Sequence, residues 1–355
     1  MAAEQNQPPS LAEIGERAWL RRVRRWVERQ PDAMRERLVV GVGDDAAVLK
    51  LGDPRLVVTT DALIEGVHFR PEWTAPRDLG WKAMAANLSD LAAMAARPVA
   101  AFLSLSLPGE SLTHDVEALF RGMLEAGRRW GCPLAGGDLT RAPQWCLALT
   151  LLGEPMRRGR VARRYTARPG DRLYVTGAPG ESGAGLEALR RGLKGKAPAG
   201  LIRRHQRPTP RLAEAEVLIH CCRRLTMLDV SDGIWNDASQ LAEASGAGID
   251  LEASRLPVSR PLRRLGAALN VDPLDWVLFG GEDYELLFAA GESEERIERA
   301  FGAAGLATPV SRIGVVRKGR GVRLLDERGR PIPRADRTFQ HFQESEPWRN
   351  PSAKS

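Results

Sequence analysis

Acidic residues recur in this chain at the ends of short apolar runs, each in a turn that carries glycine, serine or threonine. The runs end in GVGDDAAV (Asp44), VVTTD (Asp61), NLSD (Asp90), GGDLT (Asp138), LDVSDG (Asp229 and Asp232) and GGEDYEL (Glu282). Carboxylates gathered at one sheet edge repel one another unless cations hold them. Oxygen ligands suit Mg²⁺, which takes few protein ligands and bridges to phosphates. One such turn is an ordinary loop, but the repetition predicts phosphate chemistry with several metal ions.

The common nucleotide-binding motifs are missing. The glycine-rich stretch GAPGESGAG at 177–185 lacks the Lys-Ser/Thr pair that ends a P-loop, and the chain has no HRD catalytic loop. This stretch either cradles phosphate at the start of a helix predicted from Ser182 or is only a tight turn. The sequence leaves both readings open.

Composition excludes several classes of protein. With 355 residues, 43% hydrophobic and 27% charged, the chain has the size of two domains and the make-up of an ordinary globular protein. The net charge is +7, yet the arginines lack the interleaved aromatics of a single-strand platform, so we expect no nucleic-acid partner. They read as solvated arginines or as sites for small phosphorylated ligands.

No segment reads as a membrane span or a signal peptide. The most apolar stretch, 91–107, is interrupted by Arg97 and Pro98, and the first ten residues have no apolar core. The four cysteines form no CxxC pair, which argues against a zinc site or a disulfide framework. We therefore expect a cytoplasmic protein with no membrane partner.

The periodicity of apolar residues places these turns on an alternating set of helices and strands. Helices are predicted at 11–29, 78–97 (with Asp78 as N-cap and Pro98 as the stop signal), 113–130 (ending at Gly131), from 182, and at 210–223 and 235–245. Strands are predicted at 38–42, 46–51, 56–60, 99–107, 144–152, 172–176, 226–230, 284–289 and 313–316. Several strands follow one another directly, so the predicted class is α+β with mixed sheets and helices packed on them.

The arginine-rich segment after residue 156 has no clear period and is the predicted domain junction. The expected division is an N-terminal tail and helix at 1–34, a domain at 35–155, a second domain at 156–342 and a loose tail at 343–355. Asn87 and Asp90 lie three residues apart on one predicted helix, so Asn87 is expected to orient Asp90.

Eight motifs, in order, resemble those of the thiamine-monophosphate kinase family. They are GVGDDAAV, TTD…GVHF, KAMAANLSDLAAM, GGDLTR, RPGDRLYVTG, HQRPTPRL, DVSDG and GGEDYEL, and they lie within about residues 35–342. The resemblance implies the two-domain fold of aminoimidazole ribonucleotide synthetase. It implies a kinase, a phosphotransferase with a phosphate acceptor, that moves the γ-phosphate of ATP to thiamine phosphate and yields thiamine diphosphate. It also implies several Mg²⁺ ions and a homodimer paired through the N-terminal domain, whose active sites lie near the interface.

Carried over by motif position, the resemblance assigns roles to individual residues. Magnesium would be held by Asp44, Thr59, Thr60, Asp61, Asp90, Asp138, Asp229 and Asp232. ATP would contact Gly137, Asp138, Arg164 and Ser231, and thiamine phosphate would contact His68, Glu282 and Phe339. No residue is expected to act as a dedicated general base, since a phosphate monoester oxygen is largely ionised near pH 7.

Two positions depart from the family pattern, and two other classes of function stay open. Arg164-Tyr165-Thr166-Ala167 stands where the family shows Arg-Ser-Gly-Ala, and Phe339 stands where tyrosine is also found. One alternative is another ATP-dependent enzyme of the same superfamily. The chain lacks the early reactive cysteine of selenophosphate synthetase and the C-terminal cysteine of the hydrogenase-maturation relative. The other alternative is a metal-stabilised binding module without catalysis.

Overall fold

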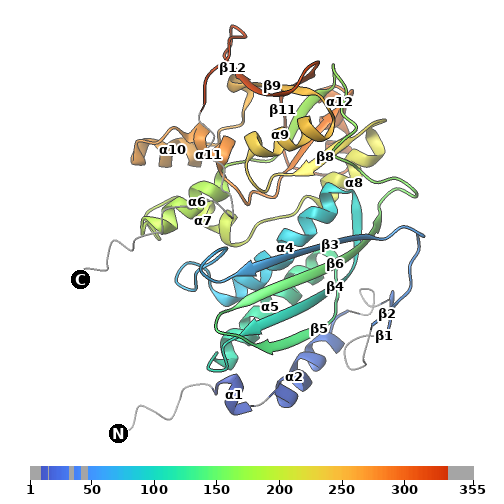
Figure 1. The fold of residues 1–355 in the computed structure, drawn as a ribbon, viewed down its shortest axis with the longest axis vertical. Helices are drawn as coiled ribbons and strands as arrows, with labels where there is room; N and C mark the ends of the chain where they lie inside the picture. The colour runs from blue at the N-terminus through green and yellow to red at the C-terminus, as the bar shows by residue number, and fades with distance from the viewer. Residues whose placement is uncertain (1–8, 15, 32–35, 41–46, 335–355) are drawn as a thin grey trace.

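The N-terminal half is built on a four-stranded sheet with two long helices against one of its faces (Figure 1). The computed structural model describes residues 9–14, 16–31, 36–40 and 47–334. The elements of this half are α1 (Leu11–Ile14), α2 (Glu16–Glu28), β1 (Leu38–Val40), β2 (Val48–Leu49), β3 (Val57–Ile64), α4 (Pro76–Ala93), β4 (Ala96–Leu107), α5 (Thr113–Trp130), β5 (Leu134–Arg141) and β6 (Cys146–Pro155). The sheet order is β3-β6-β4-β5, with β5 parallel to β4 and the other neighbours antiparallel.

Helix α4 is buried almost all round, because it packs between the sheet, α5 and the C-terminal half. Its sequence is rich in alanine, which lets neighbouring elements approach closely. At Gly80 an added Cβ would lie 2.0 Å from the carbonyl oxygen of Leu119, and at Gly122 it would lie 1.8 Å from that of Arg77. The backbones of the two helices therefore contact each other directly, which fixes the position of α4 and of the acidic residues on it.

The C-terminal half contains a six-stranded mixed sheet of order β12-β9-β11-β7-β10-β8. Only the β12–β9 pair is parallel. The elements are β7 (Arg172–Thr176), α6 (Glu181–Arg190), α7 (Ala199–Gln206), α8 (Leu212–Cys221), β8 (Thr226–Asp229), α9 (Ile234–Ala244), β9 (Gly248–Glu252), α10 (Arg260–Leu269), α11 (Pro273–Phe279), β10 (Leu286–Ala290), α12 (Glu294–Ala303), β11 (Val310–Arg317) and β12 (Gly321–Leu325).

One hydrophobic cluster spans the two halves, and a second large cluster lies within the C-terminal half. Tyr174 and Phe288 of the six-stranded sheet stack at 5.1 Å and belong to the same buried cluster as Leu91 of α4. Met227 of β8 joins this cluster, so the strand that ends at Asp229 is fixed against α4. The predicted α+β class with mixed sheets is confirmed. Among the described helices, none is long and apolar enough to cross a membrane.

The predicted helix at 78–97 is wrong at both ends. Helix α4 begins at Pro76 after Ala75, and Asp78 is not its N-cap but pairs with Arg207 at 3.3 Å. It ends at Ala93, and Ala95 at φ 52° turns the chain directly into β4, so Pro98 lies inside a strand at a register shift and does not stop the helix. The prediction used proline as the stop signal, but the left-handed turn precedes it.

Two other elements were predicted with the correct bounds, and several others were predicted wrongly or not at all. Helix α5 and strand β7 have the predicted bounds, and Gly131 ends α5 at φ 68°. Strand β3 continues three residues past Asp61, so this aspartate lies within a strand and not at its end. The GGDLT motif, predicted as a turn, lies within β5. The prediction also lacked α7, β9, α10, α11, α12 and β12.

Candidate functional site

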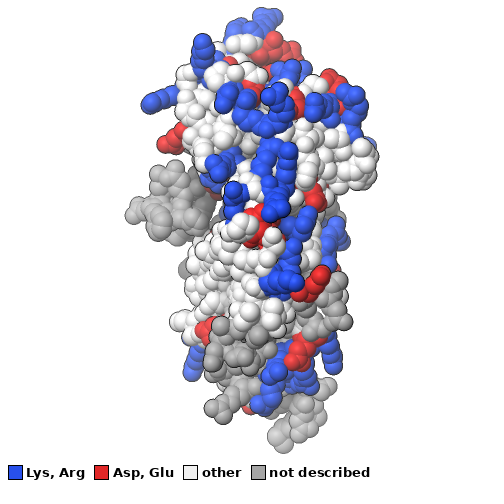
Figure 2. All heavy atoms as spheres, turned by 90° about the vertical axis from the view of Figure 1, so that its right-hand side faces the viewer, with Lys and Arg blue, Asp and Glu red and all other residues white. Residues whose placement is uncertain are grey.

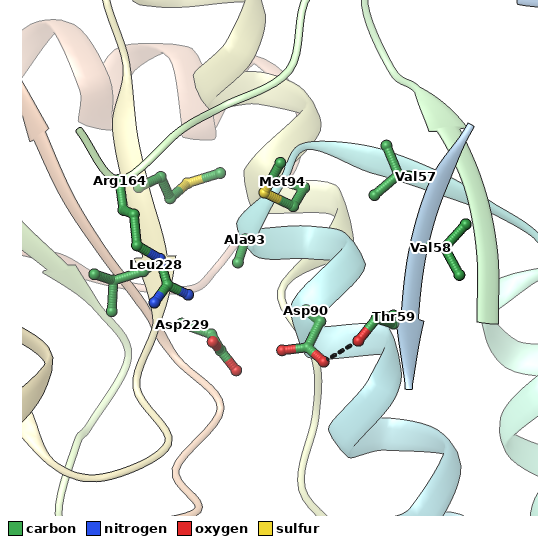
Figure 3. Close-up of a pocket in the computed structure, with 10 residues that line it drawn as sticks. Val57, Val58, Thr59, Asp90, Ala93, Met94, Arg164, Leu228 and Asp229 are labelled. Carbon is green, nitrogen blue, oxygen red and sulfur yellow. Dashed lines mark hydrogen bonds between the residues drawn. The ribbon is translucent and has the colours of Figure 1, made fainter. Parts of the chain in front are cut away.

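A cavity of about 230 Å³ lies where β3, α4 and β8 meet the connection between β6 and β7. Its polar lining comes from Thr59, Asp90, Arg164 and Asp229, each from a different segment of the chain. The rest of the lining is apolar: Val57, Val58, Ala93, Met94, Met227 and Leu228. Figure 3 shows the carboxylates of Asp90 and Asp229 and the guanidinium of Arg164 directed into one space. Four of the sequence-predicted residues therefore converge here.

Hydroxyl groups orient both carboxylates. Thr59 Oγ1 donates to Asp90 Oδ2 at 2.5 Å, and Ser89 Oγ donates to Asp229 Oδ2 at 2.7 Å. The expectation that Asn87 orients Asp90 is wrong, because the Asn87 amide donates to the carbonyl of Ala83 in its own helix at 3.0 Å. The Thr59 contact could be anticipated only from the packing of β3 against α4, which the sequence does not show.

Three neighbouring acids, Asp61, Asp90 and Asp229, destabilise one another's charge. Burial raises the pKa of Asp61 to about 6 and that of Asp229 to about 7, and in both the charge of Asp90 adds to the effect. Burial also raises the pKa of Asp90, although the Thr59 hydroxyl and the Arg164 charge oppose this. Such values are typical of sites that receive a cation or a proton.

The donor set suits a hard divalent cation that takes only part of its coordination from protein. In the described part of the chain, no three His, Cys, Asp or Glu side chains converge tightly enough to enclose an ion by themselves. Mg²⁺ commonly uses one or two carboxylates and fills its other positions with water and phosphate oxygens. Asp232 accepts from the Asn236 amide at 2.9 Å, and Asp44 lies outside the described residues.

Thr60, Gly137 and Asp138 do not join the cluster within one chain. The Thr60 side chain alternates with Thr59, so it lies on the other face of the sheet, where Thr150 donates to its hydroxyl at 3.1 Å. Asp138 lies on β5, at the opposite edge of the sheet from β3, where it accepts from Thr140 at 2.9 Å. Both side chains are exposed.

The residues predicted to contact thiamine phosphate border a second polar cluster. Glu282 lies at φ 62°, a left-handed conformation for a non-glycine residue, and pairs with Lys82 Nζ at 2.8 Å. Burial disfavours its charge, but the charge and the hydrogen bond of Lys82 outweigh this, and the pKa of Glu282 is lowered. Ser231 accepts from the Glu282 amide at 2.8 Å, which joins the predicted ATP and substrate residues. Phe339 lies outside the described residues.

Sequence reasoning missed Lys82 and His205. Lys82 lies in the run LGWKAMAANL and is fully buried, and His205 begins HQRPTPRL and is 3% exposed. A lysine amid alanine, tryptophan and methionine in a buried helix was the available signal, because an unpaired buried charge is costly.

The glycine-rich stretch does not leave a free helix end for phosphate. The amides of Gly180 and Ser182 donate to the Asp283 carboxylate at 2.5 and 2.9 Å, so a side chain of this chain caps α6. Of the two readings of GAPGESGAG, the structure therefore supports the tight turn.

Basic side chains form a band along one side of the molecule, which Figure 2 shows. The connection between β6 and β7 contributes exposed arginines at 157, 158, 163, 164 and 168. Arg164 alone among these lines the cavity, and its Nη1 donates to Gln240 at 3.0 Å. Arg163 instead donates to the Tyr165 hydroxyl at 2.9 Å. Positive charge therefore borders a cavity whose other ionic groups are carboxylates, a combination that suits a polyanion carrying metal ions.

Comparison with known proteins gives a consistent set of relatives. Residues 43–154 match the N-terminal domain of AIR synthase related proteins, and residues 168–327 match their C-terminal domain. The thiamine-monophosphate kinase of Mycobacterium tuberculosis (strain H37Rv) is 39% identical over 282 residues, which are 79% of this chain and 82% of that protein.

Solved structures of such enzymes share the fold. The thiamine-monophosphate kinase of Stenotrophomonas maltophilia K279a superposes with a TM-score of 0.75 at 36% identity, covering 86% of this chain and 94% of that one. AaThiL complexed with AMPPCP and TMP gives a TM-score of 0.71 at 32% identity, covering 94% of this chain and 99% of that one. The aminoimidazole ribonucleotide synthetase-like fold predicted from the motifs is thereby confirmed.

Proposed function

The chain belongs to the thiamine-monophosphate kinase family, and we propose that the residues of its cavity transfer the γ-phosphate of ATP to thiamine phosphate. The products are thiamine diphosphate and ADP. The observation that carries this proposal is the convergence of Asp90, Asp229 and Arg164 on one cavity beside Asp61. Carboxylates alone would repel a nucleoside triphosphate, so their repulsion must be offset when the nucleotide binds.

Magnesium ions fit this requirement. Burial and mutual repulsion raise the pKa values of Asp61 and Asp229, and the charge of Arg164 offsets the rise at Asp90 only in part, so the three carboxylates favour a bound cation. The proposed ligand set is completed by Asp44, Thr59, Thr60, Asp138 and Asp232. Bound Mg²⁺ would supply charge neutralisation at the phosphates and alignment of the transfer. Arg164 supplies a fixed positive charge on the other wall of the cavity, where it would contact the nucleotide together with Gly137, Asp138 and Ser231.

The reaction needs no side-chain base. The attacking oxygen belongs to a phosphate monoester, whose second pKa is about 6, so it is already ionised at pH 7. His68 is unsuited to that role in this structure, because its Nδ1 accepts the backbone amide of Ile64 at 3.1 Å and its proton lies on Nε2. We assign His68, Glu282 and Phe339 to the binding of thiamine phosphate.

A homodimer through the N-terminal domain completes the proposal. Val39 (65% exposed), Val48 and Val58 (56%) leave an apolar surface on β1, β2 and β3 that pairing would cover. Such pairing would also let Gly137 and Asp138, at the far edge of the sheet, approach the acids of a second copy. Along the chain, the four-stranded sheet ends with β6 at Pro155 and the six-stranded sheet begins with β7 at Arg172, which supports the proposed domain boundary between residues 155 and 156. Light scattering should give about twice the 38.9 kDa mass of one chain.

The direct test is a coupled assay of ADP formation by the purified protein. Turnover should require both Mg²⁺ and thiamine phosphate. Equal ADP release without thiamine phosphate, or turnover of an aminoimidazole precursor in its place, would show that another reaction of the superfamily is the right one.

A further inference from the structure

Lys82 and His205 form a buried polar cluster with Glu282 that the proposed reaction does not yet use. The Lys82 ammonium lies 2.8 Å from Glu282 Oε1, 2.9 Å from Glu282 Oε2 and 3.4 Å from His205 Nε2. On its other side, His205 Nδ1 lies 3.2 Å from Ser182 Oγ and 3.4 Å from Glu282 Oε2. Lys82 comes from the N-terminal half, and the other three come from the C-terminal half.

The protonation of this cluster follows from its burial. Burial lowers the pKa of His205 to about 3, and the charge of Lys82 adds to this. A neutral His205 accepts a hydrogen bond from Lys82 at Nε2, and its Nδ1 then carries the proton towards Ser182 and Glu282. Lys82 has no exposed surface, so Glu282 supplies the charge that makes its burial tolerable.

Glu282 differs from the two buried groups because its side chain is partly exposed. Its side chain is 25% exposed, whereas that of Lys82 is 0% exposed and that of His205 is 3% exposed. Its backbone is held in a left-handed conformation, and its amide donates to Ser231. Residues other than glycine adopt this conformation at a cost that surrounding contacts must offset, and such residues cluster at functional sites.

We propose that Lys82 is a positioning residue for thiamine phosphate, acting through Glu282, and that neutral His205 fixes the direction of the Lys82–Glu282 pair. The proposal rests on the proposed function, in which Glu282 contacts the substrate. Because the pair carries no net charge, Glu282 presents an oriented hydrogen-bond acceptor and not an unpaired anion. Since Lys82 and Ser89 lie on the same helix, α4, one rigid element positions both Glu282 and Asp229.

The test is a double-mutant cycle between Lys82→Met and Glu282→Gln, read in the KM values of both substrates. Each single change should raise the KM for thiamine phosphate about tenfold and leave the KM for ATP within about twofold. In the Glu282→Gln background, Lys82→Met should add less than about twofold, because the group through which it acts is already altered.

A matched control separates positioning from stability. Arg224→Met removes the cation that pairs with the buried carboxylate of Asp171, away from the cavity. Like Lys82→Met, it should lower the melting temperature, but it should change neither KM. If Lys82→Met does not fold, His205→Gln is used in the same cycle, with a smaller but equally selective rise in KM for thiamine phosphate.

The outcomes distinguish this inference from the function on which it rests. Additive effects of Lys82→Met and Glu282→Gln, or equal increases in the KM of both substrates, would overturn the positioning role while thiamine phosphate turnover by the wild type stands. No change of KM in Glu282→Gln would remove Glu282 from the substrate site and the proposal with it. Failure of the proposed function would appear earlier, as wild-type ADP formation that does not depend on thiamine phosphate.

Discussion

The two acidic regions around α4 are built in opposite ways. At the cavity, Asp90 and Asp229 lie beside Asp61, all three with raised pKa values, and hydroxyl groups of Thr59 and Ser89 donate to the first two. In the second region, Glu282 pairs with Lys82 of the same helix α4, and its pKa is lowered. The first region is ready for cations that arrive with a ligand. In the second region the chain supplies its own cation, so the carboxylate of Glu282 is held in a fixed orientation.

The largest effect is expected where acids lack a cation. Asp61→Asn and Asp229→Asn should each lower kcat at least about tenfold, or about 1.4 kcal/mol at the transition state, because each removes a charge of the proposed metal site. Melting of the ligand-free protein should stay the same or rise as repulsion falls, which calorimetry measures.

The matched control is an aspartate that the chain compensates by itself. Asp250 pairs with Arg317 and Arg323 at 2.8 and 2.7 Å, and these arginines lower its pKa. Asp250→Asn should lower the melting temperature and leave kcat unchanged. Wild-type activity in both cavity variants would contradict the metal assignment.

The second prediction concerns the fixed cation of the cavity. Arg164→Gln should lower kcat/KM for ATP about tenfold, because it removes the one arginine among the described cavity-lining residues. Arg163→Gln is the control: it removes the same charge from the adjacent position, which contacts Tyr165 outside the cavity. Similar losses in both variants, restored equally by low salt, would indicate a general electrostatic field and not a specific contact.

A variant of His68 distinguishes a role in substrate binding from a role in proton transfer. His68→Asn should raise the KM for thiamine phosphate about fivefold and lower kcat by less, which is the pattern of lost ground-state binding. Steady-state kinetics between pH 6 and 9 measure both parameters. A loss of kcat by about a hundredfold with rescue at high pH would identify His68 as a general base.

The acids of the cavity were predictable from the sequence, and the Lys82 cluster was not. Asp90 and Asp229 lie in short acidic motifs that stand out without knowledge of the fold, whereas Arg164 was assigned only through the family resemblance. The Lys82–Glu282 pair joins residues 200 positions apart, and neither forms a local pattern with the other. Asp138 shows the converse, because its motif predicts a turn, yet pairing with β4 makes it part of a strand at the far edge of the sheet.

The fold was predictable where local signals agree with packing. Helix α5 has an amphipathic pattern and a glycine at its end, and its bounds were predicted correctly. Helix α4 is buried on nearly all sides, so it lacks that pattern, and only the turn at Ala95 defines its end. The helices α10 and α11 were not predicted, although Ser259 and Asp272 cap them and a proline stands in the first turn of each.

The smallest effect on turnover at pH 7 is expected from His205→Gln. This variant tests the cluster of Lys82, His205 and Glu282 through the pH dependence of protein stability. The pKa of His205 is about 3 in the folded protein, against an ordinary value of 6.5. Between these values the unfolded chain binds a proton that the folded protein excludes, so the stability of the wild type falls as the pH drops from 6.5 towards 3. The charged groups that act on the ring are Lys82 and Arg190, which oppose its protonation, and Glu282, which favours it. Glutamine cannot titrate, so from pH 6.5 to 4.5 the variant should lose less unfolding free energy than the wild type, by up to about 2 kcal/mol. Urea unfolding at several pH values measures this difference, and parallel curves for the two proteins would show that His205 is not held neutral between Lys82 and Glu282.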